Sequence, residues 1–152
     1  MGVMAWDSNL NKWNSILPGK SGDKNEDYRS WGKPVYAMVD GMVVQFKNDI
    51  PNNPKPGTDL SPPQIVEGNH FYIQHGDELA LYAHLQKGSL NSNFLTKGAH
   101  VNKGDFLGLS GYSGNGTGNG TGCLKVLKEF AFGFDYFPKT SNYFPPCSFI
   151  LT

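Results

Sequence analysis

The sequence lacks net charge, long apolar runs and an apolar leader, and each absence excludes a class of function. Lys and Arg number 13, and Asp and Glu number 13, in a chain of 152 residues. This balance predicts neither a nucleic acid nor an anionic membrane surface as partner. No run of about 18 apolar residues exists, so we predict no membrane span. The first residues, MGVMAWDSNLNKW, form no signal peptide, so the chain is either cytoplasmic or has an export segment outside this sequence.

The sequence also lacks the cysteine and glycine motifs of metal clusters and phosphate sites. Cys123 and Cys147 have no CxxC spacing, so free thiols are the prediction and a disulfide between them is the alternative. The stretch GYSGNGTGNGTGCLK (111–125) has neither a GxxxxGK[ST] pattern nor a GxGxxG pattern inside a βαβ unit. We therefore expect this stretch to be a loop between strands and not a phosphate site.

What the sequence has instead is 19 Gly, 10 Pro and repeated short strand patterns. Alternating or β-branched runs predict strands at 34–41, 42–47, 69–76, 78–85, 99–104 and 106–111. Turns are expected at Asp40–Gly41 and Gly76–Asp77. The segment 48–64 contains five prolines and is predicted to be a surface loop. These patterns together predict one compact antiparallel β domain.

Two segments near the carboxyl end have more than one interpretation. CLKVLKEF (123–130) fits a short amphipathic helix as well as it fits a strand. The tail 129–152 carries six Phe and two Tyr. It is either an aromatic cover over the sheet or an exposed aromatic surface for a partner.

Histidine supplies the first candidate for chemistry. His84 lies at the end of an otherwise apolar predicted strand, where a titratable ring needs a partner or a function. His70 and His75 are five residues apart on one predicted strand, so their side chains face opposite sides of the sheet. We interpret these two histidines and His100 as structural residues.

Four segments in the expected order carry a family resemblance: WGKPVYAMVDGMVV (31–44), GNHFYIQHGDELALYAHLQKGSL (68–90), KGAHVNKGDFLGLSG (97–111) and SGNGTG (113–118). They are similar to the opening strands, the YAH hairpin, the turn-rich segment and the glycine loop of the lysostaphin/LytM-type zinc metallopeptidases, which cut peptide bonds in bacterial peptidoglycan. The resemblance implies an all-β fold: a folded antiparallel sheet of the duplicated-hybrid-motif type, with long surface loops and the aromatic tail. It also implies a single domain over 1–152, best supported at 31–122 and divergent at 123–152.

The resemblance assigns a role to two residues. AWD (5–7) and NEDY (25–28) are similar to elements of one branch of the family, and Asp7 matches the aspartate of its zinc-binding HxxxD motif. His84 matches the YAH histidine, which assists catalysis in the family. We therefore expect Asp7 as a metal ligand and His84 as a catalytic residue.

Three histidines of the family's site are replaced in this chain. Val3 stands at the histidine of HxxxD, and Cys123 and Lys125 stand at the two histidines of HxH. A thiolate can bind zinc, but the ammonium group of a lysine has no lone pair to donate. Zinc is the cofactor that the resemblance implies, and with Asp7 as the one matched ligand its binding in this chain is doubtful.

The resemblance therefore predicts a metalloendopeptidase-like domain whose hydrolysis is impaired or lost. Its partners would be peptidoglycan peptides, and its location would be extracellular or periplasmic. The alternative is a non-catalytic module of the same fold that binds the cell wall or activates a partner amidase. The replaced histidines reflect either degeneration of the site or a shifted reading frame, and the coding DNA would decide between the two.

Overall fold

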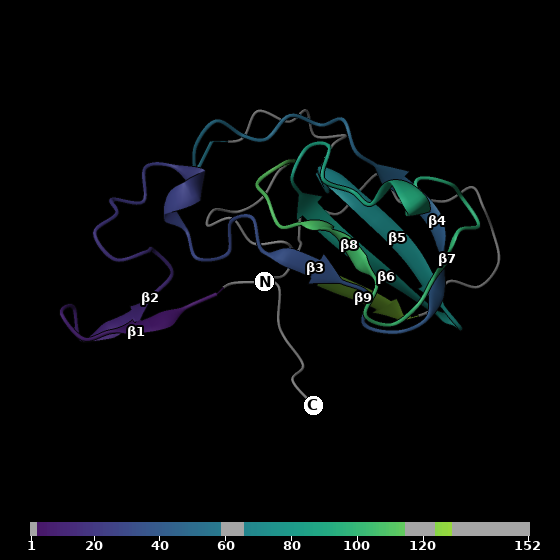
Figure 1. The fold of residues 1–152 in the computed structure, drawn as a ribbon, viewed down its shortest axis with the longest axis horizontal. Helices are drawn as coiled ribbons and strands as arrows, with labels where there is room; N and C mark the ends of the chain where they lie inside the picture. Colours follow the sequence, from purple (N-terminus) through teal and green to yellow (C-terminus); the bar gives the residue numbers. More distant parts are fainter. Residues whose placement is uncertain (1–2, 59–65, 115–123, 129–152) are drawn as a thin grey trace.

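The computed structural model describes residues 3–58, 66–114 and 124–128, which form short strands joined by loops (Figure 1). In chain order the elements are β1 (Ala5–Asp7), β2 (Lys12–Asn14), the 3₁₀ helix η1 (Asn25–Asp27), β3 (Pro34–Tyr36), β4 (Gly41–Lys47), β5 (Asn69–His75), β6 (Glu78–Leu85), the 3₁₀ helix η2 (Ser92–Phe94), β7 (His100–Val101), β8 (Phe106–Leu109) and β9 (Leu124–Lys128). These ranges contain no α-helix, and no helix in them is long and apolar enough to cross a membrane. The all-β fold class predicted from the sequence is confirmed.

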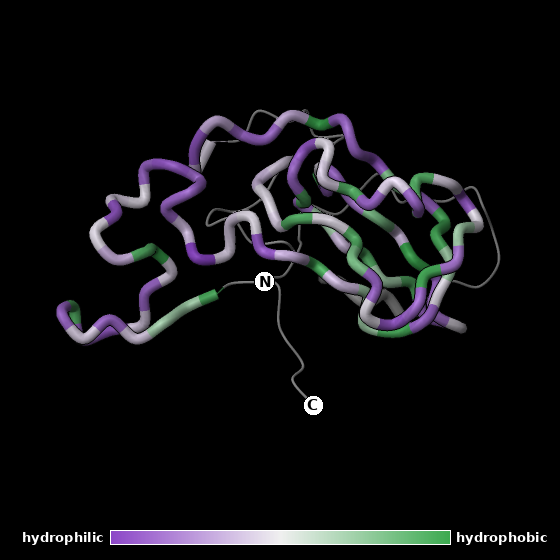
Figure 2. The backbone as a smooth tube through the Cα atoms, viewed as in Figure 1, coloured by the Kyte–Doolittle hydropathy of each residue, from purple (hydrophilic) through white to green (hydrophobic). Residues whose placement is uncertain are grey.

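The core is a five-stranded antiparallel sheet in the order β7-β4-β5-β6-β9. β5 and β6 form the predicted hairpin, and Gly76 has a φ of 59° in its turn. Successive side chains of a strand point to opposite faces, and here both faces bury apolar groups. Phe71 and Ile73 belong to the larger apolar cluster, whereas Tyr72 and Leu81 belong to a smaller one. Figure 2 shows the apolar residues concentrated along these strands.

The prediction for residues 34–47 is wrong in its pairing. β3 ends at Tyr36 and pairs with β8 in a separate two-stranded sheet, while β4 pairs with β5 and β7. Gly41 is the first residue of β4 and does not form a turn between paired strands. A Cβ atom on Gly41 would lie 2.5 Å from the carbonyl oxygen of Gln74. Glycine is required there because the backbones of β4 and β5 approach closely.

Residues 3–33 lie outside the five-stranded sheet and are tied through Ser110 to the end of β8 (Figure 1). The N–H of Gly32 donates to the Ser110 carbonyl (2.9 Å), and the N–H of Ser110 donates to the Lys33 carbonyl (2.8 Å). The N–H of Lys33 also donates to Ser110 Oγ (3.1 Å). These bonds fix the beginning of β3 against the end of β8.

The proline-rich loop is held against the sheet by buried asparagines. Asn69 Oδ1 accepts the N–H of Ile50 (2.8 Å), and Asn69 Nδ2 donates to the Ile50 carbonyl (2.8 Å). Asn53 Nδ2 donates to the Gly114 carbonyl (2.9 Å). The described part of this loop, residues 48–58, therefore lies across the segment that leads into the glycine-rich stretch. The remainder of the predicted loop lies outside the described residues.

The structure also decides one of the two open interpretations near the carboxyl end. Residues Leu124–Lys128 form β9, which pairs antiparallel with β6, so this segment is a strand and not a helix. The prediction for the aromatic tail 129–152 and the predictions for Cys123 and Cys147 lie outside the described residues.

Candidate functional site

His84 lies at a β-bulge near the end of β6. Leu85 pairs with Asn69 and Tyr82 pairs with Phe71, so two residues of β6 stand opposite one residue of β5. His84 has a φ of 56°, a left-handed conformation that costs about 1–2 kcal/mol for an L-residue. Bulges and strained residues of this kind occur often beside functional sites, where they redirect a side chain.

The backbone and ring of His84 contact loops instead of β5. Its N–H donates to the Glu67 carbonyl and its carbonyl accepts the N–H of Gly111, both at 2.9 Å. Ring atom Nδ1 lies 2.7 Å from the carbonyl oxygen of Ser113. Because a carbonyl oxygen only accepts, Nδ1 carries the hydrogen, and Nε2 of the neutral ring keeps its lone pair. His84 can therefore accept a proton or a hydrogen bond at Nε2.

Burial is the main influence on the charge of His84. It lowers the pKa of the imidazole from the ordinary value of 6.5, while the Ser113 carbonyl and the Glu67 charge oppose this effect. The lowered pKa keeps the ring neutral at pH 7. The neutral form is the one that a general base or a hydrogen-bond acceptor needs.

Glu67 and His70 act electrostatically on His84, and Tyr72 contacts both Glu67 and His70. We call these four residues the His84 cluster. His70 Nδ1 donates to the Gly68 carbonyl (2.8 Å), and burial lowers the pKa of this histidine as well. The Tyr72 hydroxyl donates to Glu67 Oε1 (3.3 Å), and burial raises the pKa of the phenol. The Glu67 charge raises the pKa of both histidines, so this carboxylate acts on both rings.

Close packing of two loops sets the orientation of both histidine rings. A Cβ atom on Gly68 would lie 2.4 Å from the carbonyl oxygen of Ser113, and one on Gly114 would lie 2.3 Å from the backbone nitrogen of Gly68. Gly68 and Ser113 supply the carbonyl groups that bind His70 Nδ1 and His84 Nδ1. A shift of either loop would therefore move a ring of the cluster.

The structure places Asp7 apart from the His84 cluster. Asp7 ends β1 in a two-stranded hairpin, which Figure 1 shows at one end of the molecule, away from the five-stranded sheet. Its Oδ1 accepts the N–H groups of Asn9 (3.1 Å) and Leu10 (3.2 Å), and its Oδ2 accepts Asn14 Nδ2 (3.3 Å). These bonds, that of Asn14 first, lower the pKa of the carboxyl group. In this arrangement Asp7 stabilises a turn, and its role as a metal ligand stays a prediction.

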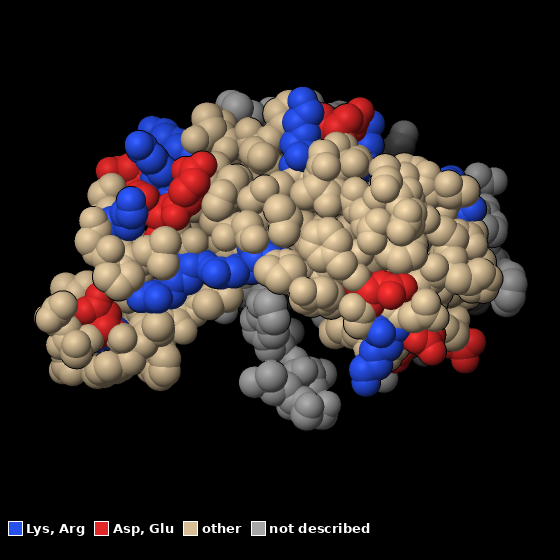
Figure 3. Space-filling view, in the orientation of Figure 1, with Lys and Arg blue, Asp and Glu red and all other residues tan. Residues whose placement is uncertain are grey.

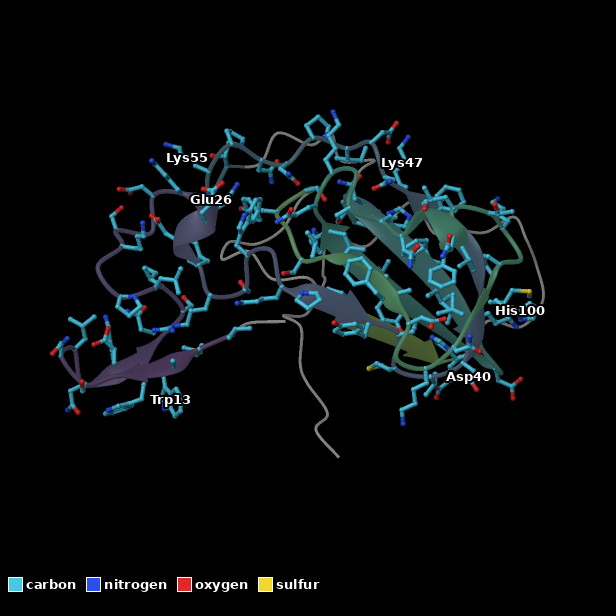
Figure 4. All side chains as sticks on the ribbon, viewed as in Figure 1. Trp13, Glu26, Asp40, Lys47, Lys55 and His100 are labelled. Atoms are coloured by element: carbon cyan, nitrogen blue, oxygen red, sulfur yellow. The ribbon has the colours of Figure 1, made fainter. Side chains whose placement is uncertain are left out.

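A hollow of about 450 Å³ lies at the opposite end of β5 and β6 from His84. Asp40 and His100, which Figure 4 labels, line this hollow. Met42 of β4 and Gly76 of the β5–β6 turn line it as well. No member of the His84 cluster lines this hollow. His100 is exposed at this hollow and is therefore separate from the His84 cluster.

Comparison with known proteins assigns the family. The family model described as peptidase family M23 matches residues 26–123, which is more than half of the chain. The chain belongs to peptidase family M23. It is also 35% identical over 88 residues to the peptidoglycan DD-endopeptidase ShyA of Vibrio cholerae. That match covers 57% of this chain and 16% of the relative, so the chain spans a small part of that relative's length. No solved structure matches the chain.

The residues that the structure describes in this M23 chain do not fit a hydrolytic zinc site. Such a site holds the ion with three protein ligands and leaves one position open. Within the described ranges, no group of three or more His, Cys, Asp and Glu side chains could hold a metal ion. Asp7 precedes the matched range and Cys123 is outside the described residues. The backbone of Lys125 lies in β9 opposite Leu81. A lysine at this position cannot serve as a metal ligand, because its ammonium group has no lone pair.

The sequence of this M23 chain indicated His84 but not the residues around it. Glu67 and Tyr72 carry no motif, and His70 was interpreted as structural. The signals were position alone: Glu67 directly precedes the segment that resembles the family hairpin, and Tyr72 follows His70 with the two-residue period of a strand. The bulge at His84, which brings the four residues together, leaves no mark in the sequence pattern.

The M23 domain is expected to lose stability as the pH falls below 6.5. Burial lowers the pKa values of His70 and His84 in the folded state, so below 6.5 the unfolded chain binds more protons than the folded chain. Their contribution to stability is complete above 6.5 and decreases as the pH falls toward the lowered pKa values. Urea unfolding at pH 7.5 and at pH 5.5 would measure the difference.

Variants separate this effect from the titration of carboxyl groups. Combined His70→Gln and His84→Asn substitutions should reduce the pH dependence, and His84→Asn tolerates the left-handed backbone. His100→Asn removes an exposed ring and serves as the matched control. An undiminished pH dependence in the combined variant would contradict the prediction.

Proposed function

We propose that this M23 chain binds peptidoglycan peptides, in the periplasm or outside the cell, and that its hydrolytic activity is impaired or lost. The name of the relative ShyA, a peptidoglycan DD-endopeptidase, supports the ligand. The observation that carries the loss of hydrolysis is the separation of Asp7 from the His84 cluster, together with the hydrogen bonds that occupy both of its carboxylate oxygens. The proposal treats residues 1–152 as one domain.

His84 is the residue of the cluster that is prepared to meet a ligand. Its Nδ1–H is fixed on the Ser113 carbonyl, and its Nε2 has no hydrogen-bond partner among the described residues. Nε2 can accept the N–H of a bound peptide or, in a residual reaction, take a proton as a general base. Zinc would supply an activated water in the family's reaction. Since the described donors do not fit the ion, no step of this proposal depends on it.

Binding and lysis measured side by side test the proposal. The chain is expected to sediment with purified insoluble peptidoglycan and to leave the turbidity of that suspension unchanged, with or without a chelator. His84→Asn should weaken sedimentation by about two- to twelvefold, because one hydrogen bond to a bound peptide contributes about 0.5–1.5 kcal/mol. It should also remove any residual lysis.

Two outcomes would contradict the proposal. One zinc ion per chain by mass spectrometry, with lysis that a chelator abolishes, would show an active metallopeptidase. Absence of the chain from the peptidoglycan pellet would remove the ligand. The His100→Asn variant is the control for His84→Asn, because it changes an exposed histidine at the other end of the sheet.

A further inference from the structure

The exposed apolar side chains of this molecule gather in two short segments. In the described parts of the chain, the large hydrophobic residues that are exposed all lie in 3–13 or in 36–42. They are Val3, Met4, Trp6, Leu10 and Trp13 in the first segment, and Tyr36, Met38, Val39 and Met42 in the second. The first segment is the β1–β2 hairpin with the residues before it and its turn, and it contains both of the exposed tryptophans.

The two tryptophans form an aromatic pair on one face of the hairpin. Trp6 and Trp13 are directly opposite in the register, so their side chains share a face. Their ring centroids are 6.0 Å apart and their planes meet at 78°, so one ring presents its edge to the other. Trp6 is 53% exposed and Trp13 is 61% exposed. Figure 4 shows Trp13 at the end of the molecule that the hairpin forms.

The turn of the hairpin is fixed before any ligand arrives. Asp7 accepts hydrogen bonds from the backbone of Asn9 and Leu10 and from the side chain of Asn14. These three bonds close the turn and join the two strands. A face whose shape is already fixed loses little conformational entropy when it binds.

The polar groups in the turn beside the indoles are uncharged, and the charged pair of the hairpin, Asp7 and Lys12, lies one position along and so on its other face. The turn between β1 and β2 is Ser8-Asn9-Leu10-Asn11, whose exposed hydroxyl and amide groups both donate and accept hydrogen bonds. Lys12 is the cation of the hairpin, and the Asp7 carboxylate is already hydrogen-bonded within it. Figure 3 shows both acidic and basic side chains at this end of the molecule, with uncharged surface between them. The face therefore has no basic cluster for an anionic ligand.

The area of the pair is small for a protein partner. An indole buries about 150–250 Å², so the exposed halves of two indoles offer roughly 200 Å², against about 800 Å² on each side of a stable protein interface. A sugar ring matches this size. Its C–H face is apolar and stacks on an aromatic ring, and its edge carries neutral hydroxyl and amide groups that Ser and Asn side chains can bind.

We propose that the Trp6–Trp13 face of the β1–β2 hairpin binds an uncharged glycan strand. The inference rests on the proposed function in one respect, since peptidoglycan contains glycan strands as well as peptides. It assigns the peptide to the His84 cluster and the glycan to the hairpin. The two contacts lie on separate elements of the same chain.

Isothermal titration calorimetry with soluble oligomers of N-acetylglucosamine tests the glycan contact, because this probe contains no peptide. The full chain is expected to bind the hexamer, and Trp6→Ala with Trp13→Ala should weaken binding roughly tenfold or more, as truncation of a central aromatic contact does. Trp6→Phe with Trp13→Phe keeps an aromatic pair and should weaken binding less than the alanine variant. Tyr36→Ala, an exposed aromatic residue of the second segment, is the matched control and should bind unchanged.

Several results would overturn the glycan site: no binding of the hexamer by the full chain, equal binding by the double alanine variant, or a change of oligomeric state in that variant by sedimentation. Thermal melts of the variants show that the core stays folded. Failure of the proposed function would give a different result in the binding measurements. A chain that binds the hexamer through the tryptophans but shows no dependence on the peptide part of peptidoglycan would keep the glycan site and reject the peptide ligand.

Discussion

Replacing Asn69 with leucine is expected to lower the free energy of unfolding by about 3–5 kcal/mol, because each buried backbone group that loses its partner costs about 1–3 kcal/mol. Asn69 is fully buried. Its amide group accepts the N–H of Ile50 and donates to the carbonyls of Ile50 and Leu85. Leucine has a similar volume but offers none of these bonds. Urea unfolding followed by far-ultraviolet circular dichroism would measure the loss.

A matched asparagine shows whether the loss comes from these bonds. Asn93 is exposed in the 3₁₀ helix η2, so Asn93→Leu should change the free energy of unfolding by no more than about 0.5 kcal/mol. The two variants add the same apolar side chain. A loss at Asn69 that is as small as the loss at Asn93 would mean that Asn69 does not hold the proline-rich loop on the sheet.

Gly68→Ala is the second large effect, with an expected loss of about 3–5 kcal/mol from backbone strain and steric overlap combined. Gly68 has a φ of 62°, and a Cβ atom on it would lie 2.4 Å from the backbone of Ser113. Neither side can give way easily, because both are backbone atoms. The substitution should also disturb the His70 ring, whose Nδ1 binds the Gly68 carbonyl. Thermal unfolding and the imidazole signals in proton nuclear magnetic resonance would report the two effects.

Gly88→Ala separates the two causes. Gly88 has a φ of 71°, and a Cβ atom on it would meet nothing within 4 Å. This variant should therefore lose only the strain of the left-handed backbone, about 1–2 kcal/mol. If both variants lose the same amount, the close contact between Gly68 and Ser113 contributes nothing to stability.

The sequence predicted the parts of the fold that depend on neighbouring residues. The hairpin of β5 and β6 follows from strand alternation on both sides of Gly76–Asp77, and these signals lie within a few residues of each other. The pairing of β3 does not follow, because Tyr36 pairs opposite Phe106, far along the chain. The turn signal at Asp40–Gly41 was also misleading. Gly41 is needed for its contact with Gln74 on the neighbouring strand, which no local pattern shows.

The candidate site was predictable to the same limited extent. His84 stood out because it is a polar residue in an apolar strand, and the resemblance supported it. Its partners did not stand out, because the bulge depends on the register between two strands and the contact of Gly68 with Ser113 joins segments separated by more than forty residues of sequence. Asp7 was indicated by the resemblance alone, and the structure shows its carboxylate closing a turn instead of facing His84. A zinc site depends on distances between separate segments, which residue types in sequence do not specify.

The bonds between Ser110 and residues 32–33 delay the folding of this chain while it is being synthesised. The N–H of Lys33 binds a residue that is 77 positions later. At about 5–20 residues per second, the segment that begins β3 leaves the ribosome and waits roughly 4–15 s before its partner is made. β3 therefore emerges as an unpaired strand, and the domain cannot close during synthesis until β8 has followed it.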